Sequence, residues 1–204
     1  MTGIRCALLV AFAIAIASPV LAEPRIVLPR AGQVGIGVQG GYGLLLKNGA
    51  IGETFGAGES YTVRLRYRMR YERGLGLTFE NNSFDARTEV PYTGEPSTAP
   101  RKLGVILSGL EFYQMFNTRT RNVSMLSLGA GLVQQRVKLN SGETELSGTF
   151  SGDGFFLSAG AGLERFVYRS IAIDVSTRYY AMFREGKPGH NVQVALGAIF
   201  YAGY

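Results

Sequence analysis

The sequence predicts an all-β protein, an eight-stranded antiparallel transmembrane β-barrel, and three observations lead to this prediction. Apolar residues alternate with small or polar residues along eight segments of about 10 to 14 residues, which is the period of an extended strand with two different faces. No segment between them shows the period of about 3.6 residues that marks an amphipathic helix. Glycine is also abundant, at 28 of 204 residues, which is roughly twice its usual share.

The first 22 residues form a separate segment ahead of these strands. Arg5 gives the segment a positive start, residues 7–17 are apolar, and Pro19 precedes a small-residue cleavage site at residues 20–22. This is the pattern of a secretory signal peptide, which is removed from the mature protein. The alternative, an uncleaved anchor helix, is disfavoured because the apolar run is too short to cross a bilayer.

Cleavage of this segment sets the charge and cysteine content of the mature chain. Cys6 is the only cysteine, so the mature chain has neither a disulfide nor thiol chemistry, although it enters an oxidising compartment. Loss of Arg5 leaves 20 basic and 15 acidic residues, a modest net charge of +5. No later stretch of about 18 apolar residues occurs, so we expect no transmembrane helix.

One segment, YTVRLRYRMRY at residues 61–71, shows the two-faced pattern most strongly. Arginine occupies every second position, at 64, 66, 68 and 70, and large apolar groups occupy the alternate positions. In a strand the arginines share one face, whereas a helix would scatter them around its circumference. The other predicted strands cover residues 33–44, 74–80, 103–116, 126–132, 155–164, 171–180 and 191–204.

The connections between the predicted strands alternate in length. Short ones lie near residues 72–73, 117–122 and 168–170, and longer ones cover residues 47–59, 81–102, 140–154 and 184–190. An even number of antiparallel strands with alternating short and long connections is typical of barrels in the bacterial outer membrane. The strand at 103–116 has no clear phase, and a β-bulge near Ser108 and Gly109 would account for this.

A soluble eight-stranded barrel of the lipocalin type is the main alternative, and the polar face of the strands decides between the two. That face carries mostly Gly, Ser, Ala and Gln with scattered charges, which suits the narrow interior of an eight-stranded barrel. The bulky apolar face suits contact with lipid. Aromatic residues near the strand ends predict two interfacial girdles. They are Tyr71, Tyr113, Phe116, Phe166, Tyr168 and Tyr204 at the short turns, and Tyr42, Tyr61, Phe84, Phe155, Tyr179 and Phe183 at the long loops.

The chain ends in HNVQVALGAIFYAGY, a strand with a final aromatic residue. Phe200 and Tyr204 in this strand resemble the carboxy-terminal assembly signal of outer-membrane proteins, although that signal usually ends in Phe. Together with the signal peptide and the amphipathic segments, this run resembles the OmpA-like and OmpX-like family of small, porin-like outer-membrane β-barrels. The resemblance covers nearly the whole mature chain and implies recognition by the barrel-assembly machinery. It implies little about activity, because one fold hosts many functions.

A glycine motif near the start of the barrel has two readings. Residues 35–40, GIGVQG, match the G-x-G-x-x-G fingerprint of dinucleotide-binding proteins. A nucleotide site would need a helix directly after the motif, but the motif lies within a predicted strand and no helical pattern follows. The glycines are therefore expected to relieve crowding in the lumen.

His190 is the only histidine, and the family resemblance implies one catalytic alternative for it. Lipid A deacylases and palmitoyltransferases are related barrels with a catalytic His. The deacylases place a Ser two residues after this His, where the present chain has Val192. Ser158 and Ser176 are candidate nucleophiles by residue type alone. We therefore expect no enzyme, no cofactor and no metal site.

Charged residues on the polar face form the most informative set. The residues expected in the lumen are Arg64, Arg66, Arg68, Arg70, Arg178, Glu80, Glu111, Glu164 and Asp174. A lumen filled by pairs of these residues is favoured, because eight strands leave little room beyond the side chains and unpaired buried charge is costly. The alternative is an arginine-lined, anion-preferring pore. Nucleic acid binding is not expected, because the opposite strand face would then expose six large apolar groups to water.

These inferences divide the chain into a signal peptide over 1–22, a periplasmic N-terminal segment over 23–32 and an outer-membrane barrel over 33–204. The short turns are expected to face the periplasm and the four longer loops the outside. The predicted role is structural or surface interaction, with a narrow pore second and a lipid A-modifying acyl enzyme third. Expected partners are outer-membrane lipid, lipopolysaccharide and an extracellular ligand at the loops, above all at 81–102.

Overall fold

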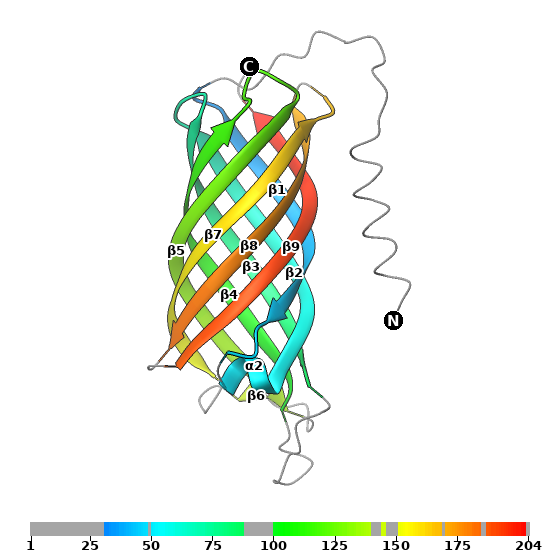
Figure 1. Cartoon of the computed structure of the whole chain (residues 1–204), viewed down its shortest axis with the longest axis vertical. Coiled ribbons are helices and arrows are strands. Elements are labelled where there is room, and N and C mark those ends of the chain that lie inside the picture. The colour runs from blue at the N-terminus through cyan, green and yellow to red at the C-terminus, as the bar shows by residue number, and fades with distance from the viewer. Residues whose placement is uncertain are drawn as a thin grey trace.

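The computed structural model describes residues 31–48, 50–87, 100–139, 144–145, 151–168, 170–184 and 187–202. Within these ranges eight long strands close into an antiparallel barrel, which confirms the predicted fold class (Figure 1). The strands are β1 (Val34–Leu45), β2 (Phe55–Arg68), β3 (Arg73–Ala86), β4 (Pro100–Phe116), β5 (Asn122–Leu139), β7 (Gly152–Phe166), β8 (Ile171–Arg184) and β9 (Lys187–Ala202). The signal peptide, most of the 23–32 segment and Tyr204 lie outside the described residues.

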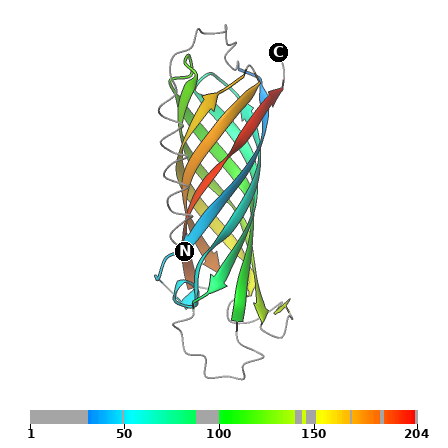
Figure 2. The same cartoon turned by 90° about the vertical axis from the view of Figure 1, so that its right-hand side faces the viewer.

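Each strand pairs with its neighbours in the chain, and β9 pairs with β1 to close the barrel. The closing register runs from Val34 opposite Ala202 to Leu45 opposite Asn191. The strands are inclined to the barrel axis (Figure 2), as closure of a sheet requires. Closure pairs each of the eight long strands with a neighbour on both sides. The backbone along the wall therefore needs no hydrogen bonds from lipid, which cannot supply them.

Three tight hairpins define one end of the barrel, here called the short-turn end. They span residues 69–72, 117–121 and 167–170. The opposite end, here called the long-loop end, holds the helix α2 (Ala50–Thr54) and the two-residue strand β6 (Thr144–Glu145), which extends the sheet beside β5 (Figure 1). Within the described residues, no helix is long and apolar enough to cross a membrane.

The strand ends differ from the prediction in three places. The register pairs Arg68 with Gly74, so the first short hairpin is centred on Tyr71 rather than on residues 72–73. Helix α2 and the start of β2 occupy the region predicted as a loop at 47–59. The connection predicted at 184–190 is a tight one, because Arg184 pairs with Lys187. The strand ends are set by pairing with the neighbouring strand. Alternation of residues within one strand does not predict where that pairing stops.

β4 runs through its centre without a bulge. Its pairing with β3 and β5 is continuous at Ser108 and Gly109, and the register shifts only between Pro100 and Lys102. Odd-numbered residues of β4 therefore face the lumen throughout, from Leu103 to Met115. The suggested bulge at Ser108 and Gly109 is wrong.

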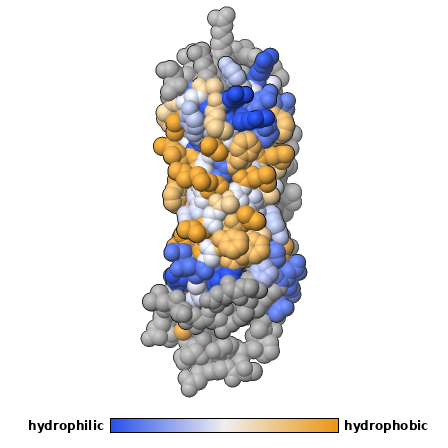
Figure 3. Space-filling view, turned by 90° about the vertical axis from the view of Figure 1, so that its left-hand side faces the viewer, coloured by the Kyte–Doolittle hydropathy of each residue, from blue (hydrophilic) through white to orange (hydrophobic). Residues whose placement is uncertain are grey.

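Large apolar side chains stay exposed on the outer wall of the barrel. Ile36, Val63 and Leu128 are 55%, 48% and 64% exposed. Figure 3 shows apolar residues over much of the visible wall, with hydrophilic residues toward both ends. An apolar surface of this extent is unsuited to water, and with the closed wall of paired strands it indicates a barrel that sits in lipid.

Aromatic residues contribute to the wall at both ends, although the predicted girdles need correction. The exposed members are Tyr71, Phe116 and Tyr168 at the short-turn end and Tyr42, Tyr61, Phe155 and Tyr179 at the long-loop end. Phe84, Tyr113 and Phe166 were predicted in the girdles, but they are fully buried. They occupy the inward phase of their strands, where they fill the two ends of the lumen.

Candidate functional site in the barrel lumen

The arginine-rich strand β2 places three of its arginines in the lumen. Arg64, Arg66 and Arg68 are buried, whereas Tyr61, Leu65 and the other alternate residues lie on the outer wall. Arg70 is the exception: it lies past the end of β2, in the exposed hairpin whose ends are joined by hydrogen bonds between Arg70 and Arg73. The prediction that Arg70 faces the lumen is wrong, because the strand ends before its position.

Glu164 on β7 is the main partner of the arginines nearest the short-turn end. Its carboxylate contacts Arg68 Nη2 at 3.0 Å and also pairs with Arg66 Nη1. Tyr201 on β9 donates its hydroxyl hydrogen to the same carboxylate at 2.8 Å. All four side chains are buried, so this cluster is a fully desolvated ion-pair network of the kind whose partners cannot be removed singly without cost.

Further into the lumen, two more carboxylates take basic or amide partners. Asp174 lies 3.3 Å from Arg66 Nη2 and accepts a hydrogen bond of 2.7 Å from the Gln39 side chain. Glu111 on β4 pairs with Arg178 Nη1 on β8 at 2.8 Å and also accepts a hydrogen bond from Tyr113. The structure thus brings together residues from β1, β2, β4, β7 and β8 that lie far apart in the sequence.

Glu80 and Arg64 do not form the ion pairs predicted for them. Glu80 accepts hydrogen bonds of 2.7 Å from Tyr180 and from Asn82, and one of 3.3 Å from Thr62. Arg64 reaches the Ser176 hydroxyl at 3.5 Å, and no carboxylate among the described residues pairs with it. The charges in the lumen therefore balance in number without all pairing in space.

In the described strands, the buried charges of the central layer sum to zero. Arg64, Arg66, Arg68 and Arg178 supply four positive charges, and Glu80, Glu111, Glu164 and Asp174 supply four negative ones. A fifth buried arginine, Arg184, lies beyond this layer, at the end of β8. The central layer is close to neutral, unlike a ring of one sign that would select ions.

Apolar side chains fill the lumen on either side of this charged layer. Toward the long-loop end the buried cluster is Leu45, Ile51, Phe55, Phe84, Leu103, Val105, Leu107, Val133, Val137, Phe156, Tyr180 and Met182. Toward the short-turn end it is Tyr113, Met115, Val123, Met125, Phe166, Ala172, Ile199 and Tyr201. An ion would have to pass both apolar clusters to cross the barrel.

Helix α2 adds to the layer at the long-loop end. Ile51 belongs to the apolar cluster there. Arg87 holds the helix in place: its Nε lies 3.0 Å from the Gly52 carbonyl oxygen, and its Nη2 lies 3.0 Å from that of Leu45. Charged donors make strong hydrogen bonds to carbonyl oxygens, so Arg87 links α2 to the end of β1.

The sequence prediction places no aromatic residue in the charged layer, but the structure puts Tyr rings against two of its arginines. The Arg66 guanidinium lies 4.4 Å from the centre of the Tyr113 ring, and the Arg68 guanidinium lies 5.1 Å from that of Tyr201. Such cation–π contacts are strongest when desolvated. The sequence does carry a signal for these residues. Tyr113, Tyr180 and Tyr201 share the inward phase of their strands with the charged residues of the lumen.

The glycine motif has a steric explanation. A Cβ added at Gly35 would lie 2.7 Å from the Tyr201 ring, and one at Gly37 would lie 2.8 Å from the Ile199 side chain. Both glycines point into the lumen, and neither precedes a helix. They make room for bulky residues of the adjacent strand β9, which is the structural role predicted for them.

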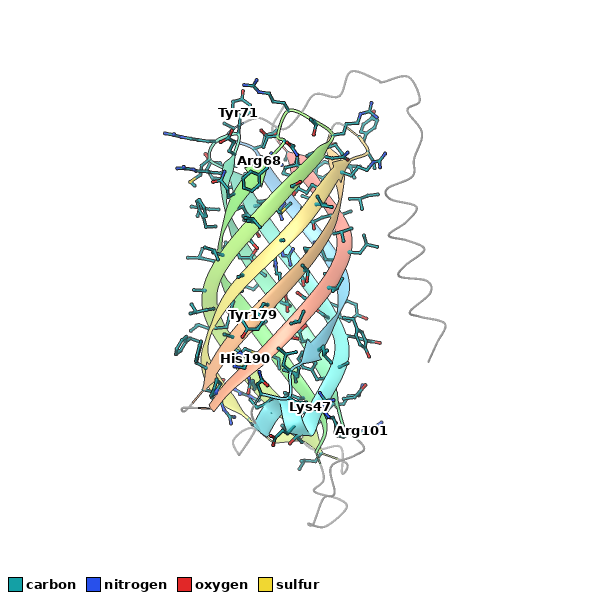
Figure 4. All side chains as sticks on the ribbon, viewed as in Figure 1. Lys47, Arg68, Tyr71, Arg101, Tyr179 and His190 are labelled. Atoms are coloured by element: carbon teal, nitrogen blue, oxygen red, sulfur yellow. The ribbon has the colours of Figure 1, made fainter. Side chains whose placement is uncertain are left out.

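His190 lies within β9 near the long-loop end, on its outward phase (Figure 4). Its Nδ1 is 2.6 Å from the Tyr179 hydroxyl oxygen, and the two rings stack. Ser158 and Ser176, the candidate nucleophiles, are buried on the lumen face. The structure therefore does not bring these serines together with His190.

Comparisons with known proteins agree on the fold. No protein-family model and no curated protein matches the chain, but solved structures do. Neisserial surface protein A matches with a TM-score of 0.60 and 16% identity, over 83% of this chain and 98% of that one. OprG from Pseudomonas aeruginosa matches with a TM-score of 0.58 and 11% identity, over 88% and 100%. Ail from Yersinia pestis matches with a TM-score of 0.55 and 15% identity, over 84% and 99%.

These matches are small outer-membrane barrels, so the predicted resemblance to that class is confirmed. At 11–16% identity the likeness shows the fold alone. The chain has the fold of an eight-stranded outer-membrane β-barrel.

Proposed function

We propose that the chain is an outer-membrane barrel with a closed lumen, and that its role is structural or one of surface interaction rather than transport. The observation that carries the proposal is the filling of the lumen. Four arginines and four carboxylates form a nearly neutral layer, and apolar clusters lie on both sides of it. A filled interior of this kind suits a scaffold in the membrane.

A narrow, anion-preferring pore is the second candidate, and Arg64 favours it. Arg64 is buried, and its Nε and Nη2 atoms have no hydrogen-bond partner among the described residues. A small anion that reached this depth would find these two nitrogens available as donors. The apolar clusters oppose this candidate, because one would have to open before an anion could reach Arg64 and both before it could cross the barrel.

Conductance across a planar lipid bilayer separates these two candidates. The purified barrel is expected to give no steady current, while a general porin added to the same membrane shows that channels are detected. Steady anion-selective current that falls in Arg64→Gln would overturn the closed barrel and support the pore. Arg66→Ala is a useful companion, because it removes a partner of Glu164 and Asp174 and tests whether loosening the network opens a path.

A surface role would be carried by the long-loop end. One structural neighbour, Ail, is described as an attachment invasion locus protein and was crystallised with the heparin analogue sucrose octasulfate. This supports, by analogy of fold, an interaction at the loops of the present chain. Replacing residues 89–98 with a Gly-Ser segment of equal length should reduce the adherence of cells that display the barrel. Unchanged adherence, with the folded barrel present at the surface, would count against that role.

Assembly and enzymatic activity remain predictions. Phe200 faces outward on β9 and is accessible to the barrel-assembly machinery. We propose that Phe200→Ala slows insertion into the outer membrane. The absence of enzymatic activity is tested by the lipid A of cells that express the protein. Appearance of deacylated or palmitoylated lipid A that depends on the protein would place it among the acyl enzymes.

A further inference from the structure

The short-turn end of the barrel is strongly basic. Residues 69–73, 117–122 and 165–170 contain one acidic residue, Glu72, and six arginines: Arg70, Arg73, Arg119, Arg121, Arg165 and Arg169. The net charge of these turns is therefore +5, from six positive charges and one negative charge. Among the described residues, no carboxylate pairs with Arg70, Arg73 or Arg119.

The long-loop end is different, because two of its basic side chains pair with carboxylates. Lys102 pairs with Asp85 at 3.3 Å, and Arg136 pairs with Asp153 at 3.0 Å. The positive charge of the short-turn end is thus not a general property of the barrel surface. A cluster of positive charge of this kind raises the local concentration of anions.

The basic cluster includes a recess that could hold an anion. Arg70, Tyr71, Glu72, Arg73, Thr118 and Arg119 line a hollow of about 500 Å³. It lies between the β2–β3 and β4–β5 hairpins, which a hydrogen bond of 2.7 Å from Met115 N to Glu72 O holds together. Thr118 is nearly buried, whereas the arginines are exposed. Guanidinium groups in this arrangement suit phosphate oxygens, which they bind in a planar, bidentate way.

Exposed aromatic residues place this recess at the membrane surface. Tyr71 and Tyr168, which are 59% and 65% exposed, lie in the short turns, and Tyr67 is exposed near the end of β2. Figure 4 shows Tyr71 at the same end of the barrel as Arg68. Tyr side chains settle at the level of lipid headgroups, so the neighbouring guanidiniums lie at the level of lipid phosphates.

From the charge, the recess and the aromatic level together, we infer that the short-turn end binds the headgroups of anionic phospholipids, with Arg70, Arg73 and Arg119 on the phosphate. The lipids are those of the leaflet that faces the short turns. Basic residues near a membrane surface each contribute about fivefold to the affinity for anionic lipid. Loss of all three arginines should then weaken binding by roughly 100-fold.

Native mass spectrometry of the barrel in neutral detergent can test this directly. The folded protein is titrated with phosphatidylglycerol or with phosphatidylcholine, and bound lipids are counted. The wild type should bind phosphatidylglycerol with clear preference. The variant R70Q/R73Q/R119Q should lose that preference by roughly 100-fold. The matched variant K47Q/R101Q/K138Q removes three exposed charges from the long-loop end and should keep it.

Each other outcome contradicts the inference. Equal binding of the two lipids by the wild type would show that the barrel does not recognise the negative charge of the headgroup. An equal loss in the matched variant would show that only net charge matters. Displacement of the lipid by millimolar inorganic phosphate would indicate an anion site without lipid specificity. If the triple variant fails to fold, Arg119→Gln in its exposed turn should still lose about fivefold, and no loss there would overturn the assignment.

Discussion

Glu164 is the position where the charged lumen can be tested most sharply. Replacing it with Gln keeps the size of the side chain and an acceptor for Tyr201, but removes the negative charge. Arg66 would keep Asp174, at 3.3 Å, whereas Arg68 has no other carboxylate partner among the described residues. Removing one partner of a buried ion pair costs about 3–5 kcal/mol. Because Arg66 remains paired, we expect Glu164→Gln to lower the free energy of unfolding by about 3 kcal/mol.

The chain has no tryptophan, so unfolding in lipid vesicles is best followed by the gel mobility of the folded barrel in urea. A loss of about 3 kcal/mol should lower the urea midpoint by roughly 1–3 M. The double variant Glu164→Gln with Arg68→Met should recover part of this loss, because it also removes the charge left unpaired.

Glu59→Gln, an exposed acidic position on β2, serves as the control for the loss of one carboxylate. It should change the free energy of unfolding by no more than about 0.5 kcal/mol. The reasoning is refuted if Glu164→Gln behaves like this control, since the arginines would then not depend on the network.

Three further predictions concern packing and the barrel wall. Gly35→Val should destabilise the barrel by about 1–3 kcal/mol or prevent folding, because its Cβ would lie 2.7 Å from the Tyr201 ring. The control is Gly40→Val on the same strand, where a Cβ meets open space. This variant should fold normally in the same gel assay. Leu128→Arg places a charge on the exposed wall of β5 and should cost about 2–4 kcal/mol in vesicles, with no loss expected if the wall faced water. Arg87→Ala should speed hydrogen exchange in residues 46–54 while the barrel strands keep their protection, because α2 loses its side-chain hydrogen bonds; unchanged exchange would show that Arg87 does not hold the helix.

Which residues face the lumen could be predicted from the sequence, because alternation follows from the geometry of a single strand. Arg64, Arg66, Arg68 and Arg178 follow this alternation and are buried. The same rule failed for Arg70, because the end of β2 depends on pairing with β3. Alternation predicts which face a residue takes within a strand. It does not predict the residue at which the strand ends.

The partners of the lumen charges could not be predicted from the sequence. Glu80 binds Tyr180 rather than an arginine, and Arg64 is left with Ser176. These contacts depend on the relative height of β2, β3 and β8 around the closed barrel, which strand register sets. Nearness to a strand end predicts Phe84, Tyr113 and Phe166 in the girdles, but their phase along the strand turns them into the lumen.

The central claim, that the lumen is closed, is tested most directly by the reactivity of a cysteine placed inside it. The mature chain is expected to have no cysteine of its own, because Cys6 lies in the predicted signal peptide. Ser176→Cys adds one thiol among Arg64 and Gln39, and Thr120→Cys adds one in an exposed turn. With a small water-soluble thiol reagent, the cysteine at 120 should react at once and the one at 176 only after unfolding. Equal rates in the folded barrel would show that water and ions reach the lumen, and would contradict the account.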